Sequence, residues 1–240
     1  MARQPRFVLP GHPQHVIQRG NNRSPIFAEV ADYCIYKDKL SEACARFSCR
    51  IHAYVLMTNH VHLLITPETE QGISKVMQSL GRQYVQYFNY RHQRTGTLWE
   101  GRYKASLLDT ARYLLTCYRY IELNPVRACM VEQPAEYRWS SYRYNALAMD
   151  DPLVMPHESY LSLATDKELR LKAYQALFDN AINEQTLIAI REATNRAWVL
   201  GCDRFRNEIE DLLQRQAAPK TRGGDHKSQT FQARCKINRV

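Results

Sequence analysis

The chain has 240 residues, of which 45% are hydrophobic, enough to bury one substantial core. Lys and Arg number 33 against 24 Asp and Glu, so the formal net charge is +9. An excess of this size favours a polyanionic partner, of which nucleic acid is the commonest. No stretch approaches the roughly 18 apolar residues of a membrane helix, and residues 1–20 lack the apolar run of a signal peptide.

The cysteines point to a reducing compartment. There are 7 of them, an odd number, scattered without a C-x-x-C pair. This pattern fits reduced thiols better than a disulfide framework or a zinc knuckle. With no export or membrane signal, we expect a cytoplasmic protein without a membrane partner.

The first half of the chain predicts alternating strands and helices. Residues 15–19 form a short predicted strand that is closed by a turn at 20–22. Helical spacing of apolar residues follows over 29–47, and two strand-forming runs, 50–57 and 60–66, are joined so tightly that they predict an antiparallel pair. A helix over 73–90, a strand over 102–108 and a helix from a capping Thr110 to about Leu123, which Pro125 prevents from continuing, complete the series.

This order, β-α-β-β-α-β-α, is that of a ferredoxin-like, RRM-like α+β fold. Such a fold has a four-stranded antiparallel sheet with helices on one face. The other face stays open, and RNA-recognition modules bind single strands there.

Beyond Pro134 the pattern changes. Two or three helices are predicted between about Ser159 and Arg215, and we expect residues 146–215 to be a helical extension with no assigned role. Residues 216–240 hold six Lys and Arg against Asp225 and are rich in Gly, Gln and Ser, which predicts a mobile basic tail.

Two histidines, His60 and His62, lie in the second strand of the predicted antiparallel pair. Side chains alternate along a strand, so both imidazoles point to one face while Val61 and Leu63 point to the other. We expect the apolar set to meet the helices and the imidazoles to face the open side, close enough to share a metal. A mixed set of imidazole and amide oxygen suits Mn²⁺ or Mg²⁺ better than structural zinc. In isolation, a polar strand face with two partly exposed histidines explains the pair better than a metal site.

A second cluster ends the helix that follows the last predicted strand. Tyr120 and Asn124 are four residues apart and therefore neighbours on one helical face. Taken alone, they also fit a core aromatic residue and a helix-ending amide. Together with the histidines they fit phosphoryl transfer, because a phenol of pKa near 10 needs help as a nucleophile and a divalent ion can orient the phosphate. Tyr113, two turns upstream on the same stripe, is the rival nucleophile.

These residues resemble the HUH transposases, in particular the REP-associated single-tyrosine transposases and the related insertion-sequence enzymes. The resemblance rests on four stretches within roughly the first 145 residues: Asn59-His-Val-His62, Tyr120-Ile-Glu-Leu-Asn-Pro125, Thr97-Leu-Trp-Glu-Gly-Arg-Tyr103 and Trp139-Ser-Ser-Tyr142. The last two resemble further family signatures, for which we expect structural or DNA-contacting roles.

The resemblance implies a catalytic domain over residues 1–145. In it, Tyr120 attacks a DNA phosphate to give a 5′-phosphotyrosine and a free 3′-OH, while His60 and His62 are metal ligands. Asn124 occupies the position of the third ligand in REP-associated members, and the ion would be Mg²⁺ or Mn²⁺. The implied partner is single-stranded DNA with hairpin-forming repeats.

Basic residues near aromatic residues suit a channel for single-stranded DNA, where bases stack and phosphates are neutralised. Arg102 and Lys104 are the strongest candidates because they share a strand face. The full set of candidates for DNA contact is Arg19, Arg23, Arg82, Arg91, Arg94, Arg102, Lys104 and Arg127.

Three alternatives stay open. The chain could be a domesticated DNA- or RNA-binding protein on the same fold without transposition activity, although a pure binder has no need for His60, His62, Tyr120 and Asn124 together. A metal hydrolase would leave Tyr120 unexplained. The active site could be built within one chain or completed by a helix of a second subunit in a homodimer.

Overall fold

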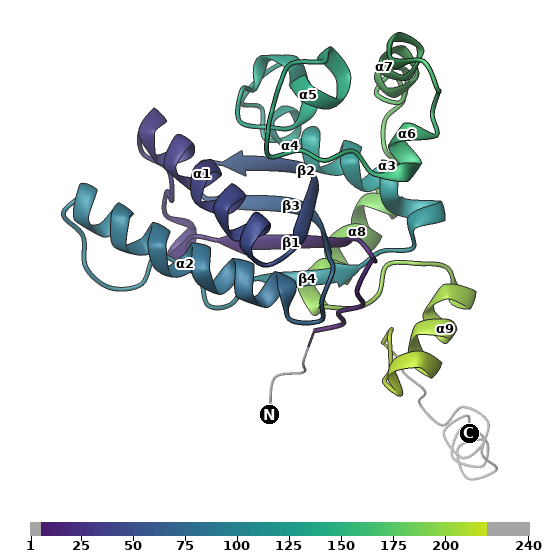
Figure 1. Cartoon of the computed structure of the whole chain (residues 1–240), viewed down its shortest axis with the longest axis horizontal. Helices are drawn as coiled ribbons and strands as arrows, with labels where there is room; N and C mark the ends of the chain where they lie inside the picture. The colour runs from purple at the N-terminus through teal and green to yellow at the C-terminus, as the bar shows by residue number, and fades with distance from the viewer. Residues whose placement is uncertain (1–5, 220–240) are drawn as a thin grey trace, which may run out of the picture.

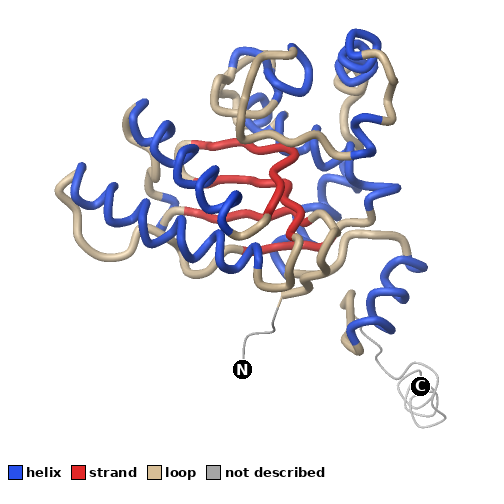
Figure 2. The backbone as a smooth tube through the Cα atoms, viewed as in Figure 1, coloured by secondary structure: helices blue, strands red, loops and turns tan. Residues whose placement is uncertain are grey.

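The computed structural model describes residues 6–219, and it centres on one four-stranded sheet (Figures 1 and 2). The strands are β1 Gln14–Arg19, β2 Cys49–Met57, β3 His60–Pro67 and β4 Lys104–Leu107. Their order is β2-β3-β1-β4, and every neighbouring pair is antiparallel. This is the topology that the order of elements predicts, so the α+β, ferredoxin-like fold class is confirmed.

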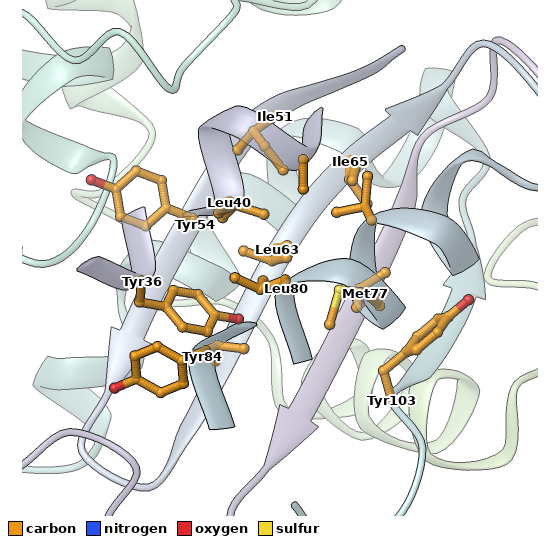
Figure 3. Packing of buried hydrophobic residues seen from close by; sticks show 14 of the residues in the cluster. Tyr36, Leu40, Ile51, Tyr54, Leu63, Ile65, Met77, Leu80, Tyr84 and Tyr103 are labelled. Carbon is orange, nitrogen blue, oxygen red and sulfur yellow. The ribbon is translucent and has the colours of Figure 1, made fainter. Parts of the chain in front are cut away.

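Two long helices, α1 Val30–Arg46 and α2 Gly72–Arg91, cover one face of the sheet (Figure 1). Their apolar stripes meet the strand residues that point to that face; Val61, Leu63 and Ile65 of β3 are fully buried there. Figure 3 shows this core, in which Leu40 and Tyr36 of α1 and Leu80 and Tyr84 of α2 close over Leu63. The predicted alternation along β3 therefore holds, and it sends His60 and His62 to the opposite face.

The opposite face is covered as well. Helix α3 Thr110–Glu122 packs on β2 and β3, and α8 Glu184–Arg196 packs on β4 and β1. The expected open side is therefore closed over His62, which is only 2% exposed. The N-cap of α3 is Asp109, and Thr110 is already its first helical residue. Pro125 does not stop the helical course entirely, because α4 Asn124–Arg127 follows at once, with this proline in its first turn.

The β2 edge of the sheet is covered by the stretch that carries Trp139-Ser-Ser-Tyr142. The Leu56 N–H donates to the carbonyl of Trp139 (2.9 Å) and the Ser141 N–H to the carbonyl of Tyr54 (3.0 Å). Further along, Val154 forms a parallel bridge with Ile51. Covered edges do not pair with other chains, so the role of this stretch in the fold is structural.

The stretch Thr97–Tyr103 extends the sheet beyond the end of β1. The Asn21 N–H donates to the Leu98 carbonyl and the Glu100 N–H to the Arg19 carbonyl, each at 2.9 Å, while Trp99 is buried in the core beneath α2. This stretch thus holds the chain immediately after β1 in place.

The remaining elements are short. They are the 3₁₀ turns η1 Asn21–Arg23 and η2 Pro134–Glu136, and the helices α5 Tyr142–Leu147, α6 Glu158–Leu161, α7 Lys167–Ala176 and α9 Asp203–Leu213. Four helices, α6 to α9, therefore lie where two or three were predicted. Helix α7 packs against α5, and α6 packs against α3.

The predicted tail begins in ordered structure. The Val199 N–H donates to the carbonyl of Ala217 (2.9 Å), and Ala217 is fully buried with Phe7 and Ile209. The rest of that tail, 220–240, lies outside the described residues. Within residues 6–219 the cysteines are free, and no helix is both long and apolar enough to cross a membrane.

Candidate active site

Strand β3 places His60 and His62 side by side at the face covered by α3 and α8. Their ring centroids are 5.0 Å apart with the ring planes at 77°. His62 is buried, whereas His60, at the end of the strand, is half-buried. The His60 Nδ1 lies 2.6 Å from Asn59 Oδ1. The other ring nitrogen of His60, Nε2, takes no part in this contact.

Tyr120 lies against the same histidines. Its ring centroid is 5.8 Å from that of His62, in an edge-to-face arrangement, and the phenol side chain is 6% exposed. The predicted pairing of a helix tyrosine with strand histidines is thus present within one chain. Tyr113, the rival nucleophile, packs half-buried beside the apolar cluster of α3, and Tyr118 points to the other side of the helix, against Tyr160 and Tyr174.

Two arginines accompany Tyr120. The Arg127 guanidinium carbon lies 4.6 Å from the Tyr120 ring centroid, and its Nη2 donates to the Tyr120 carbonyl (2.5 Å). Arg191 reaches the phenol from α8. Burial raises the pKa of the Tyr120 phenol, and the charge of Arg127 together with a hydrogen bond and the charge of Arg191 lowers it in part. Arg127, expected to contact DNA, is therefore part of the tyrosine's own surroundings.

The imidazoles are uncharged at neutral pH. Burial lowers the pKa of His60 to about 4, with the charge of Arg19 adding to the shift. Burial also lowers the pKa of His62 well below its usual range, and the neighbouring imidazoles and Arg127 act in the same direction. A neutral imidazole keeps a lone pair, which is the form that binds a metal ion.

A third histidine, His15 of β1, belongs to this cluster although no motif drew attention to it. It is 1% exposed, its Nε2 lies 2.8 Å from His62 Nδ1, and its ring meets Tyr120 edge to face at 5.5 Å. Its Nδ1 lies 2.8 Å from Oγ1 of Thr194, on α8. Strand alternation places His15 on the same face as Arg19, so pairing the strands in register would have found it. No local signal in the sequence marks Thr194 or Arg191.

Asn124 is the first residue of α4 and directly follows Leu123, the C-cap of α3. Its Nδ2 donates to the carbonyls of Tyr120 (2.9 Å) and Ile121 (3.2 Å), a helix-ending arrangement. With the nitrogen engaged in this way, Oδ1 is the atom that remains for a ligand. The amide nitrogen therefore stabilises the end of the helix, and this is compatible with metal binding by the amide oxygen.

Among residues 6–219, three acidic or histidine side chains converge at one other place, Glu29, Asp32 and His92. The Asp32 carboxylate there accepts the backbone N–H groups of Ala28 (2.7 Å) and Glu29 (3.0 Å). It also lies 3.0 Å from Tyr87 Oη and from His92 Nε2, while Glu29 pairs with Arg91 at 2.6 Å. Since its carboxylate oxygens are already used to cap α1, this cluster is a helix cap rather than a metal centre.

Part of the predicted basic set gathers around the edge strand β4. We call this surface the basic groove and define it by the basic residues that line its two adjoining hollows, where Glu100 is the one acidic neighbour within residues 6–219: Arg6, Arg19, Arg102, Lys104 and Arg196. The larger hollow has a volume of about 220 Å³. Arg19 joins the groove to the histidines, since its charge acts on His60 and His62. Arg6 and Arg196 were not among the predicted residues.

The other predicted basic residues lie elsewhere. Arg82 lines a separate cavity on the α2 side of the β4 edge, together with Arg6 and Arg102. Arg91 pairs with Glu29, Arg94 lies over the ring of Phe88, and Arg23 is exposed in η1. The structure thus brings Arg19, Arg102 and Lys104 together and does not add Arg23, Arg91 or Arg94 to them.

Comparison with known proteins gives one family and one fold. Residues 10–124 match the family model "Transposase IS200 like". No curated protein matches the chain. A solved structure of a REP-associated tyrosine transposase bound to a REP hairpin superimposes with a TM-score of 0.53 at 18% identity, covering 66% of this chain and 93% of that one. At this identity the match supports the fold.

A second solved structure, of a protein from Deinococcus radiodurans R1 assigned as a transposase, has a TM-score of 0.34 at 21% identity and covers 50% of this chain and 96% of that one. The matched segment 10–124 contains β1 to β4, α3 and both His60 and Tyr120. This match, over just under half of the chain, places residues 10–124 in the IS200-like transposase family.

Proposed function

We propose that the protein is a metal-dependent endonuclease and transposase that cuts and rejoins single-stranded DNA beside hairpins through a 5′-phosphotyrosine at Tyr120. The observation that carries this proposal is the position of the Tyr120 ring, 5.8 Å from His62, on the helix that packs over the histidine strand. We assign the catalytic domain to residues 1–145. Helix α8 of the helical extension adds Arg191 and Thr194 to its site.

The residues that would hold the ion are His60, His62 and Asn124. Both imidazoles are neutral and the Asn124 amide donates through its nitrogen, which leaves the amide oxygen as its donor atom for an ion, so the set fits Mg²⁺ or Mn²⁺, the ions that accept mixed nitrogen and oxygen ligands. When bound, a divalent ion there would polarise the scissile phosphate.

Tyr120 would supply the nucleophile. Its oxygen attacks the DNA phosphorus, the phenol proton is lost, and the bond from phosphorus to the 3′ oxygen breaks, leaving a 3′-OH and a 5′-phosphotyrosine. Rejoining reverses these bonds, with a 3′-OH attacking the phosphotyrosine and the phenol leaving. Arg127 and Arg191, which oppose the raised phenol pKa, would stabilise the negative charge on the tyrosine oxygen.

The basic groove would hold the DNA. Its arginines and lysine flank the edge strand and lead to the histidines through Arg19, which suits a backbone running into the site. A hairpin partner is supported by the structural relative, which was solved with a REP hairpin. The groove alone would equally serve a protein that only binds DNA, so the test must detect a covalent bond.

The deciding experiment is a denaturing-gel assay for a protein–DNA adduct. The protein is mixed with Mn²⁺ or Mg²⁺ and labelled single-stranded hairpin oligonucleotides from the sequence that flanks the gene. We expect an adduct that Tyr120→Phe abolishes, that the matched control Tyr113→Phe retains, and that a chelator prevents. Hairpin binding on a native gel without any adduct would overturn the proposal in favour of a binding protein.

His62→Ala is expected to abolish cleavage while hairpin binding stays within about twofold, because the metal serves the reaction more than affinity. The control is His12→Ala, which removes a histidine whose Nδ1 contacts only the Pro10 carbonyl (3.2 Å). Normal cleavage by His62→Ala would refute the metal assignment.

A further inference from the structure

His15 and Thr194 connect the interior of the site to α8 through a continuous series of hydrogen bonds. Thr194 Oγ1 lies 2.9 Å from the carbonyl of Ile190 and 2.8 Å from His15 Nδ1, and His15 Nε2 lies 2.8 Å from His62 Nδ1. These side chains are all buried. In such surroundings each polar atom needs a partner, so the direction of every bond can be worked out.

The direction is set at Thr194. A hydroxyl has one proton, and the Ile190 carbonyl can only accept, so Thr194 donates to Ile190 and its oxygen must accept from His15. The proton of His15 is therefore on Nδ1. Because a second proton would leave a charged ring buried near Arg127, His15 Nε2 keeps its lone pair and accepts from His62 Nδ1.

The ring geometry agrees with an N–H···N bond. The planes of His15 and His62 differ by 8° and their centroids are 5.0 Å apart. Stacked rings are separated by roughly 3.5 Å, whereas the two nitrogens here are 2.8 Å apart. The rings therefore lie edge to edge in nearly one plane, with the lone pair of one nitrogen directed at the proton of the other.

We propose that His15 and Thr194 are positioning residues for the metal ligand His62, whose proton they hold on Nδ1 so that Nε2 presents its lone pair to the ion. This inference rests on the proposed function, in which His62 binds the metal. An imidazole without a fixed partner can carry its proton on either nitrogen, and only one of the two forms leaves Nε2 free.

His60 also carries its proton on Nδ1, but a different residue, Asn59, holds it there. The amide of Asn59 donates its Nδ2 to the Arg23 carbonyl (3.1 Å), which turns Oδ1 toward His60 Nδ1 (2.6 Å). An amide oxygen can only accept, so His60 is also protonated on Nδ1. Both His60 and His62 thus keep a lone pair on Nε2 for an ion. The ring of His60 is held by the neighbouring Asn59, and the ring of His62 is held by His15 of β1, which is held in turn by Thr194 of α8.

One side of helix α8 contacts both the histidine cluster and the tyrosine of the site. Thr194 acts on the histidines, and Arg191, three residues earlier and on the same side of the helix, acts on Tyr120. The C-terminal third thereby acquires a role that the matched segment 10–124 alone cannot supply.

The first test reads the tautomer without metal or activity. In full-length, metal-free protein labelled with ¹⁵N-histidine, long-range ¹H–¹⁵N spectra should show His62 protonated on Nδ1 and bare on Nε2. Thr194→Val, which keeps the shape and removes the hydroxyl, should shift His62 toward a mixture of tautomers, and Thr194→Ser should restore the wild-type spectrum. Thr186→Val, on the same helix, is the control and should change nothing. A wild-type His62 protonated on Nε2 would overturn the proposal.

The second test measures Mn²⁺ binding by the same variants, from the electron spin resonance of free Mn²⁺. We expect affinity to fall about 10- to 100-fold in Thr194→Val and in His15→Phe, and Thr194→Ser and His15→Gln, which keeps a carbonyl acceptor, to retain most of it. If His62→Ala weakens Mn²⁺ binding and Thr194→Val does not, the positioning role is wrong while the proposed function stands. If His62→Ala has no effect on Mn²⁺ binding, the proposed metal site itself fails.

Discussion

Burial keeps the Tyr120 phenol neutral, while Arg127 and Arg191 act in the opposite direction. Burial thus favours the neutral phenol, and in the proposed reaction the two guanidinium groups would favour the charge on the oxygen when it reacts or leaves. Arg127 is fixed by its bond to the Tyr120 carbonyl, whereas Arg191 comes from a helix about 70 residues away in sequence.

Arg191→Ala should slow adduct formation about tenfold and leave hairpin binding nearly unchanged. A fully buried donor at such a site contributes roughly 100-fold or more, and the effect here is smaller because the Arg191 side chain is 48% exposed. The rate is measured by quenching the adduct assay at a series of times.

The matched control is Arg204→Ala, which removes the same charge from the exposed face of α9. If both variants slow adduct formation equally, Arg191 would act through general attraction of DNA rather than through Tyr120.

At the scale of elements, α3 is tied to the helices behind it by a buried carboxyl group. Glu122 accepts from Ser141 Oγ (2.6 Å), Asn145 Nδ2 (2.8 Å) and Tyr174 Oη (2.6 Å). Two helices beyond residue 134, α5 with its N-cap Ser141 and α7, thereby converge on the helix that carries Tyr120. The glutamate of the Tyr120-Ile-Glu-Leu-Asn-Pro125 stretch therefore has a structural role.

Glu122 makes stability depend on pH. Burial raises the pKa of its carboxyl to about 7, against the lowering effect of its three donors. Between about pH 4.5 and 7 the folded state thus holds a proton that the unfolded chain has released, so the contribution of this group to the free energy of unfolding falls as the pH rises through that window. The decrease is on the order of 3 kcal/mol.

Glu122→Gln should remove that fall, so its stability relative to the wild type should rise from pH 5 to pH 8. Urea unfolding at several pH values measures this difference, with exposed Glu70→Gln as the control. The buried histidines have lowered pKa values and give the opposite slope, so the difference between variants, and not the slope of one protein, is the quantity to compare. A difference that is constant across pH would contradict the assignment.

The sequence predicts the helices and strands of the first half of the chain well. It does not predict which surface of the sheet the helices of the second half cover. Strand alternation correctly separates His60 and His62 from Val61 and Leu63, because the period of two is local. The helical period similarly pairs Tyr120 with Asn124. An amphipathic helix such as α8 reveals which side is apolar, but not which surface it will cover. The closure over His62 and the contributions of Thr194 and Arg191 arise only in the folded chain.

At the scale of the whole molecule, positive charge is concentrated along one edge and continues into the C-terminal sequence. The basic groove flanks β4, and six basic residues follow Pro219. Ala217 is packed into the fold, so a deletion meant to remove charge without harming the core must begin at Lys220.

Deletion of residues 220–240 should weaken hairpin binding and flatten its dependence on salt. For single-stranded DNA, each phosphate that the protein no longer neutralises reduces the slope of log K against log salt by about 0.7. Fluorescence anisotropy between 50 and 300 mM salt measures it, and thermal unfolding of the shortened chain verifies the fold. An unchanged slope would show that these residues are not part of the DNA-binding surface.

The bond between His15 and Thr194 joins positions 179 residues apart, which has a consequence for synthesis of the protein. At roughly 5–20 residues per second, Thr194 is added about ten to forty seconds after His15. Late in that interval the emerging chain contains His60, His62 and Tyr120 but does not yet have α8 to order them. The hydrogen bond that orients His62 through His15 therefore forms only after most of the chain has been synthesised, and a translation product that ends before α8 lacks both Thr194 and Arg191.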